Sequence, residues 1–464
     1  MRTSSYILLT GNLQKNKPPW SPVSDVRPAI VHQGGLHGTG GVNPGVKEKK
    51  PEMLSPYRAL DLTDEKGLLC GKILADLGAD VIQVEKPEGN PARSIPPFFE
   101  DIAGPERSLL WFAFSAGKRS ITLNWESEAG KDLFKRLAKT ADFIIESFPP
   151  GYLERKGLGY EVLTKTNPRL ILASITPFGQ TGPFKDYKAG DLVASAMGGM
   201  VCCTGEPDRA PVRISADLAY CQAGVHAAIG LLIALSHRTA TGQGQRVDVS
   251  MQASIVRTLH TQLPYWEYGN RIVKRSGIRR FRGGVSTREI WPCKDGFVSW
   301  MFFGGAVGTQ QMRGMVEWME GKGMAGSLSA EVQNWATLDL TKVDPEKIKS
   351  WEKVIGDFFL SHTKEELYQE ALEKRIPLAP LNDMSEVVND EQLAARNFWV
   401  GVDHAELKTN LRYPGFLFLT SEENCLPKVR RRAPFVGEHN SEIYLDDLGL
   451  SEAELNSLRR ESIV

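Results

Sequence analysis

The sequence predicts an α/β protein with a Rossmann-like, open and mostly parallel sheet, joined to a smaller α+β domain. Residues 57–85 have the pattern of a strand, a helix closed by Gly78, and a second strand, which is the unit of a doubly wound sheet. Further strand patterns occur at 141–146, 169–175 and 246–249, and most follow a helical segment. A hairpin pattern at 289–300, with its turn at 294–296, then begins a different kind of domain.

The amino-acid composition argues against some classes of function. The 464 residues are 41% hydrophobic and 24% charged, as in ordinary globular proteins. Lys plus Arg and Asp plus Glu both number 56, which argues against general nucleic-acid binding. The six cysteines show no CxxC spacing or disulfide framework, so we expect a reduced, cytoplasmic chain without a metal site.

Two segments bear on targeting. Residues 1–52 are rich in Pro, Gly and Lys without periodicity, and we expect a disordered extension that carries no chemistry. We expect no membrane span, because Gly230 interrupts the longest apolar run and His226 precedes it.

The most informative stretch is 213–251, where Asp217 stands at the mouth of a long apolar helix. Residues 219–235 are almost all apolar or small, so we expect this helix to be buried on most of its surface. Ser215 offers a helix cap, and the residues alone favour Asp217 as a second capping group that complements the helix dipole. The alternative is a nucleophilic or acid–base carboxylate kept ionised by the positive end of the helix.

This stretch resembles the family III CoA-transferases, the formyl-CoA and carnitine CoA-transferase group. Residues 224–245 match the family pattern G-x-H-x-x-I-G-I-L-A-A-L-x-x-R-x-x-T-G-x-G-Q, and the resemblance runs from about residue 53 to the end. It implies that Asp217 is the nucleophile. It also implies a large CoA-binding domain at 53–255 and 400–464, a linker at 256–284 and a small domain at 285–399. Two interlocked subunits are expected, as a homodimer or as a heteromer with a paralogue.

The resemblance also implies contacts with coenzyme A, in which Phe148 would stack on the adenine and Arg155 would bind phosphate. The positions are Lys66, Lys86, Leu123, Phe148, Arg155 and Lys188. Three departures lie among them: the family often has Gln-Ala at 65–66, Arg at 86 and Asn at 147. From the residues alone, Phe148 is equally well a core side chain.

Several other charged residues and two glycines can each be interpreted as structural or as functional. Lys118 and Arg119 read as a solvated strand start, or under the resemblance as phosphate ligands. Asp191 is an acidic position near the family's active site, or a structural cap. The basic segment 271–288 is a linker, or its Gly283 and Gly284 match a mobile glycine loop.

The expected reaction is CoA transfer between carboxylic acids through an aspartyl mixed anhydride and an enzyme–CoA thioester. Acyl-CoA and acid are substrates, and no tightly bound cofactor is expected. A related racemase is the second hypothesis, but Gly190 stands where those racemases carry a proton-transferring His. A non-catalytic CoA-binding protein is the third. The acids stay open, because the aromatic residues at 266, 281, 291, 300, 302 and 303 fit a bulky-acid pocket or plain core packing.

Overall fold

The computed structural model describes residues 52–282, 285–415, 418–422 and 425–464. The predicted disordered extension lies outside the described residues except for Glu52. The predicted loop glycines Gly283 and Gly284 also lie outside them.

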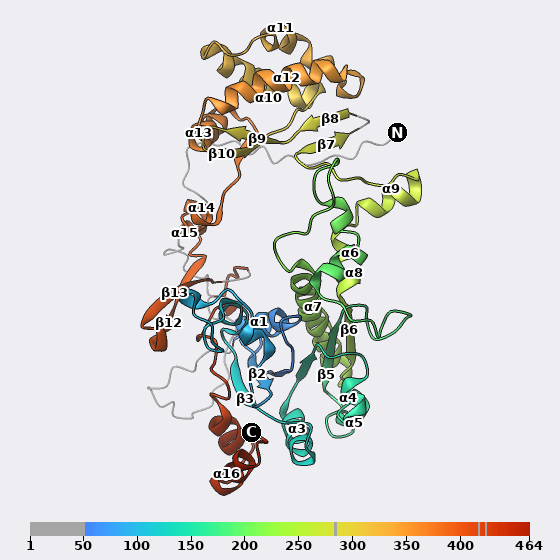
Figure 1. Ribbon diagram of the computed structural model, residues 1–464, viewed down its shortest axis with the longest axis vertical. Coiled ribbons are helices and arrows are strands. Elements are labelled where there is room, and N and C mark those ends of the chain that lie inside the picture. Colours follow the sequence, from blue (N-terminus) through green and yellow to red (C-terminus); the bar gives the residue numbers. More distant parts are fainter. Residues whose placement is uncertain (1–51, 283–284, 416–417, 423–424) are drawn as a thin grey trace, which may run out of the picture. The chain divides into compact units, whose positions relative to one another are not determined.

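Six parallel strands form the central sheet, in the order β3-β2-β1-β4-β5-β6 (Figure 1). They are β1 (Arg58–Asp61), β2 (Asp80–Glu85), β3 (Arg119–Thr122), β4 (Phe143–Glu146), β5 (Ile171–Thr176) and β6 (Arg246–Ser250). The order reverses direction between β1 and β4, which is the switch point of a doubly wound sheet. The predicted α/β class is confirmed.

Alternate side chains of the central strands enter two cores, one on each face of the sheet. Ala59, Phe143 and Ile145 pack with helices α1 (Leu68–Asp76) and α7 (Leu218–Thr241). Leu60 and Ile144 pack with α3 (Glu128–Thr140) and with C-terminal residues. Burial on both faces explains why these strands read as continuous apolar runs.

The remaining helices of this part are short or peripheral. They are α2 (Leu109–Ser115), α4 (Tyr152–Arg155), α5 (Tyr160–Leu163), α6 (Asp191–Met197), α8 (Met251–Thr258) and α9 (Gln262–Gly269). The positive φ of Gly78 (104°) ends the turn after α1, as the sequence predicts.

Helix α7 departs from expectation. It packs on α1, β5 and β6 through its small residues, but Val225, Ile229 and Ile233 on another face are exposed, Ile233 to 65%. The prediction of burial on most of its surface is therefore wrong. Its length and apolar composition would also suffice to cross a membrane, contrary to the sequence-based expectation. The small residues of α7 pack against the sheet and form part of a hydrophobic core.

Residues 285–378 hold a separate aromatic-rich core that includes Trp291, Trp300 and Phe302. The predicted hairpin is β9 (Ile290–Cys293) and β10 (Gly296–Ser299), extended by β11 (Ala379–Pro380). The other elements are β7 (Arg279–Arg282), β8 (Val285–Arg288), α10 (Gly305–Gly321), α11 (Leu328–Glu331), α12 (Pro345–Leu360), α13 (Lys364–Lys374), α14 (Met384–Val388) and α15 (Glu391–Ala395).

The C-terminal segment returns to the central sheet. After the hairpin β12 (Trp399–His404) and β13 (Thr409–Pro414), a π-helical turn (Glu442–Asp447) and α16 (Glu452–Arg460) follow. The hydroxyl of Tyr444 donates to the carbonyl oxygen of Thr122 at 2.7 Å. The Nδ1 atom of His439 accepts from the backbone N–H of Ser120 at 3.2 Å, and the backbone N–H of His439 donates to the carbonyl oxygen of Ser120. His439 therefore has a structural role, in tying the C-terminal segment to β3.

Candidate functional site

A cavity of about 400 Å³ opens at the carboxyl edge of the sheet, beside the switch point. Its walls are the segments that follow β1, β2, β3 and β4: residues 62–64, 84–94, 125 and 147–148. Open α/β sheets bind ligands at this position, because the loops there diverge to opposite faces of the sheet. The fold thus defines a ligand-binding α/β protein before any side chain is considered.

A buried ion pair fixes the β1 side of this cavity. Lys118 Nζ donates to Asp61 Oδ2 at 2.8 Å, and both side chains are fully buried. The other oxygen of Asp61 accepts from the N–H and the hydroxyl of Thr63, which lines the cavity. Lys118 is therefore neither a solvated cation nor a phosphate ligand, so both sequence-based interpretations of it are wrong. Arg119 is likewise buried, against Asp80.

A second buried pair fixes the β2 side. Arg93 donates from Nε and Nη2 to the two carboxylate oxygens of Glu85, each at 2.7 Å, and its guanidinium lies 3.8 Å from the ring centre of Trp111. Glu85 also accepts from Asn90 N–H at 2.7 Å. Since Glu85 and Asn90 both line the cavity, this pair holds the shape of the 86–94 wall.

Two of the predicted CoA residues line the cavity. Lys86 is exposed on it, and Phe148 is half-buried between the cavity and the rings of Trp125 and Tyr152. Ser147, which replaces the family's Asn, donates to Asp64 Oδ1 at 2.8 Å and so ties the β4 loop to the β1 loop. Asp64, Asn90 and Trp125 also line the cavity, and the sequence motifs do not predict them. Their position after successive parallel strands was the available signal.

The other four predicted CoA residues lie outside the cavity lining. Lys66 pairs with Asp64 and lies 3.7 Å from Glu65. Leu123 is fully buried in the core, so only its backbone could face a ligand. Arg155 donates to the carbonyl oxygen of Pro150 at 3.2 Å and is exposed, as is Lys188.

Asp217 occupies the N-cap position of α7, but its side chain makes no capping hydrogen bond. The carboxylate of Asp191, at the start of α6, instead accepts from Ala219 N–H at 2.7 Å. Burial raises the pKa of Asp191, against this opposing hydrogen bond. The side chain of Asp217 is 47% exposed. The interpretation of Asp217 as a mere cap is therefore wrong, and Asp191 is a cap.

Hydrogen bonds from Arg275 and within the loop hold the segment that precedes Asp217. Arg275 donates to three backbone carbonyls, those of Cys202, Glu206 and Arg209, at 3.0–3.3 Å. Val212 N–H donates to the Thr204 carbonyl at 3.2 Å. Arg275, in the basic segment 271–288, thus holds the loop that precedes Asp217 in place.

Gly190 adjoins the same site. A Cβ atom placed on Gly190 would lie 3.3 Å from the hydroxyl oxygen of Tyr220, so a side chain there would require this hydroxyl to shift slightly. Burial raises the pKa of Tyr220 to about 12, which keeps the phenol neutral at physiological pH. Gly190 itself supplies no side-chain base.

Asp217 does not line the cavity. Asp64 is a cavity residue, and the chain that follows it leads into α1. Helix α1 packs against α7, which begins directly after Asp217. The loop that lines the pocket therefore leads into the helix that packs against the helix of Asp217.

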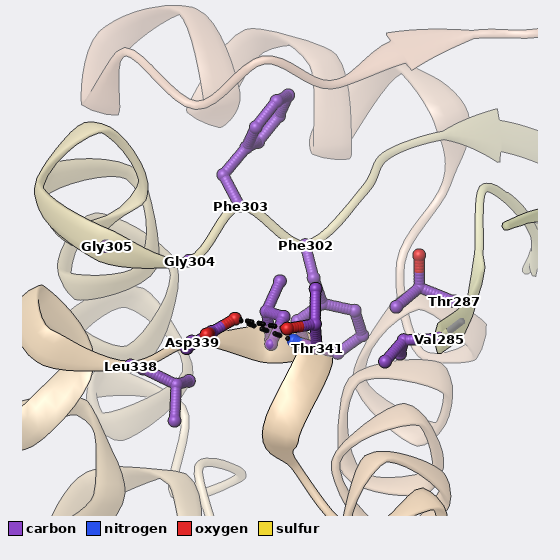
Figure 2. Close-up of a pocket in the computed structure, with 10 residues that line it drawn as sticks. Val285, Thr287, Phe302, Phe303, Gly304, Gly305, Leu338, Asp339 and Thr341 are labelled. Carbon is purple, nitrogen blue, oxygen red and sulfur yellow. Dashed lines mark hydrogen bonds between the residues drawn. The ribbon is translucent and has the colours of Figure 1, made fainter. Parts of the chain in front are cut away.

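A second cavity, of about 430 Å³, lies among residues 285–341 at the start of α10 (Figure 2). Phe302 points toward Val285 and Thr341, whereas Phe303 points away. Asp339 accepts from the N–H and the hydroxyl of Thr341. Of the six aromatic positions considered in the sequence, only Phe302 and Phe303 line this cavity; Trp266 and Phe281 are exposed.

Within the described ranges, no group of three or more His, Cys, Asp or Glu side chains is placed to hold a metal ion. The six cysteines are free thiols.

Comparison with known proteins identifies the class. The model of CoA-transferase family III matches residues 54–440. Succinyl-CoA:(R)-benzylsuccinate CoA-transferase subunit BbsE of Thauera aromatica is 34% identical over 418 residues, which is 88% of this chain and 98% of that protein. Succinyl-CoA–D-citramalate CoA-transferase of Chloroflexus aurantiacus is 31% identical, over 90% of this chain and 99% of its own.

A solved structure agrees. A CaiB/BaiF family protein from Brucella suis superposes with a TM-score of 0.75 at 28% identity, covering 86% of this chain and all of that one. The chain belongs to CoA-transferase family III, and it is an enzyme of CoA transfer.

Proposed function

We propose that the enzyme moves CoA from an acyl-CoA to a carboxylic acid, with Asp217 as the nucleophile. The observation that carries this proposal is the free carboxylate at the start of α7. Because Asp191 accepts the backbone N–H that a capping Asp217 would take, the oxygens of Asp217 remain available for bond formation.

The reaction then follows from carboxylate chemistry. Asp217 attacks the thioester carbonyl, the C–S bond breaks, and CoA thiolate is set free beside a mixed anhydride. The thiolate attacks the aspartyl carbonyl, which releases the donor acid as a carboxylate and leaves a CoA thioester on Asp217. The acceptor carboxylate attacks that thioester and forms a second anhydride, from which the thiolate takes the new acyl group. Each intermediate is about as activated as the last, so neither ATP nor a tightly bound cofactor is required.

We assign the nucleotide end of CoA to the cavity at the switch point. Phe148 offers a ring for the adenine, and Lys86 offers a cation for phosphate. Lys66, Arg155, Lys188 and the backbone at Leu123 stay predictions as flanking contacts. From the cavity, the pantetheine arm would follow the 62–66 loop toward Asp217.

We infer that the acids are dicarboxylic, since the two relatives described above are named for succinyl-CoA with benzylsuccinate or citramalate. The racemase alternative finds no support in the site, because Gly190 leaves no second base.

We propose a homodimer with interlocked subunits in the cytoplasm. The exposed apolar face of α7 supports this, because exposed apolar surface of this kind marks interfaces. A heteromer with a paralogue remains the alternative, since one relative is named a subunit. The division into a large domain (53–255 and 400–464), a linker (256–284) and a small domain (285–399) stays part of this proposal.

The test is a transfer assay with Asp217→Asn, using succinyl-CoA and a panel of di-acids. We expect turnover to fall by at least about 1,000-fold, as for the loss of a nucleophile, with unchanged CoA binding. Asp208→Asn, an exposed carboxylate in the same loop, is the matched control and should keep full activity. Activity retained in Asp217→Asn would reject the assignment.

A further inference from the structure

The charges around Asp217 are unbalanced. Asp191 accepts from the N–H of Ala219, two residues after Asp217, so two carboxylates lie at the start of α7. A dicarboxylic substrate keeps one free carboxylate after its other end has become a thioester. Bringing that charge beside these two is costly unless a cation receives it.

Arg213 is the cation in position to do so. Its Nη2 lies 3.6 Å from Asp217 Oδ1, which is longer than a hydrogen bond, and its side chain is 52% exposed. Its Nε donates to the Ile214 carbonyl at 3.2 Å, which orients the guanidinium. Among the residues that the structure describes, neither terminal nitrogen of Arg213 donates a hydrogen bond, so both are available for a substrate oxygen.

Three arginines of the basic segment 271–288 are committed elsewhere. Arg275 holds the backbone carbonyls of the approach loop, while Arg279 pairs with Glu352 and Arg280 with Glu289. Arg213 itself sits directly after Val212, whose N–H is bonded to Thr204, so its place in the chain is defined. The basic segment thus supports the loop through Arg275, and the cation beside the nucleophile comes from the loop itself.

We propose that Arg213 binds the free carboxylate of a dicarboxylic acyl group, and so selects di-acids over mono-acids of equal length. This rests on the proposed function of Asp217. On substrate binding, the loose pair between Arg213 and Asp217 opens, the guanidinium turns to the distal carboxylate, and the thioester carbonyl is left facing Asp217. Planar guanidinium groups suit this role, because they bind carboxylates through two parallel N–H donors.

The experiment compares CoA exchange for chain-matched pairs of acids. Malonyl-, succinyl- and glutaryl-CoA, each with its own isotope-labelled acid, are set against propionyl-, butyryl- and valeryl-CoA. In Arg213→Gln we expect kcat/KM for the di-acids to fall roughly 10- to 100-fold, and the mono-acid values to stay within about threefold. Arg213→Lys should recover part of the di-acid rate. Arg169→Gln, an exposed arginine before β5, should change neither series.

The outcomes separate the two proposals. An equal fall in both series would mean that Arg213 acts on Asp217 or on the loop, and it would overturn the inference. Unchanged di-acid rates, or a wild-type enzyme that prefers mono-acids, would also overturn it. A wild-type enzyme without exchange on any pair would reject the proposed function itself, and the inference with it.

Discussion

The cavity wall and the approach to Asp217 are built in opposite ways. At the wall, Glu85 and Arg93 are almost completely buried and joined by two short hydrogen bonds. At Asp217, the nearest cation is 3.6 Å away and both partners are about half exposed. Buried pairs are costly to break, whereas exposed pairs contribute little. The difference indicates a preformed binding pocket beside a reactive group that is left free to change partners.

The largest stability effect should come from breaking the wall. We expect Arg93→Met to lower the free energy of unfolding by about 3–5 kcal/mol, because it leaves Glu85 buried without a counter-charge. The 86–94 wall should loosen with it, so CoA should bind more weakly. Denaturant unfolding and calorimetric titration with CoA measure both effects. Lys353→Met, which breaks an exposed pair with Asp357, should cost no more than about 1 kcal/mol. Equal losses of unfolding free energy in Arg93→Met and Lys353→Met would contradict the contrast between buried and exposed ion pairs.

Glu146, at the end of β4, gives a pH test of the same rigid edge. Burial raises its pKa from 4.5 to about 7, although Phe148 N–H donates to its carboxylate at 2.6 Å. A raised carboxyl pKa means that the folded state favours the proton. The stability from this group is therefore full below about pH 4.5 and is lost as the pH rises through about 7. At roughly 1.4 kcal/mol per tenfold change, wild type should lose about 3 kcal/mol relative to Glu146→Gln across that window. Parallel pH profiles of the two proteins would show that Glu146 is not buried as described.

The smaller effect concerns the cap that frees Asp217. We expect Asp191→Ala to cost about 1 kcal/mol of stability, the usual value of a lost helix cap, and to lower kcat because Asp217 can then turn back to the Ala219 N–H. Asp191→Asn keeps an acceptor oxygen and should restore most of both. If Asp191→Ala lowered stability and left kcat unchanged, the cap would be unconnected with the chemistry.

These contrasts mark what the sequence could predict. The sheet and its crossover helices follow from local periodicity, and the carboxyl edge follows from strand order. Lys118 and Arg119 were misread because adjacent cations look solvated, while their partners Asp61 and Asp80 lie far away in sequence. The exposed face of α7 was not predicted, because apolar composition does not reveal which faces of a helix the rest of the chain covers. Asp191 can cap α7 only because α6 and α7 meet in the fold. No local sequence pattern predicts that contact.

The most direct test is to trap the acyl-enzyme. The enzyme is mixed with succinyl-CoA and quenched with hydroxylamine. The tryptic peptide of residues 214–238, in which Asp217 is the only side-chain carboxylate, is then analysed by mass spectrometry. The account predicts a hydroxamate on Asp217 that appears only with the thioester and is absent from Asp217→Asn. A hydroxamate on another peptide, or none in an enzyme that turns over, would contradict it.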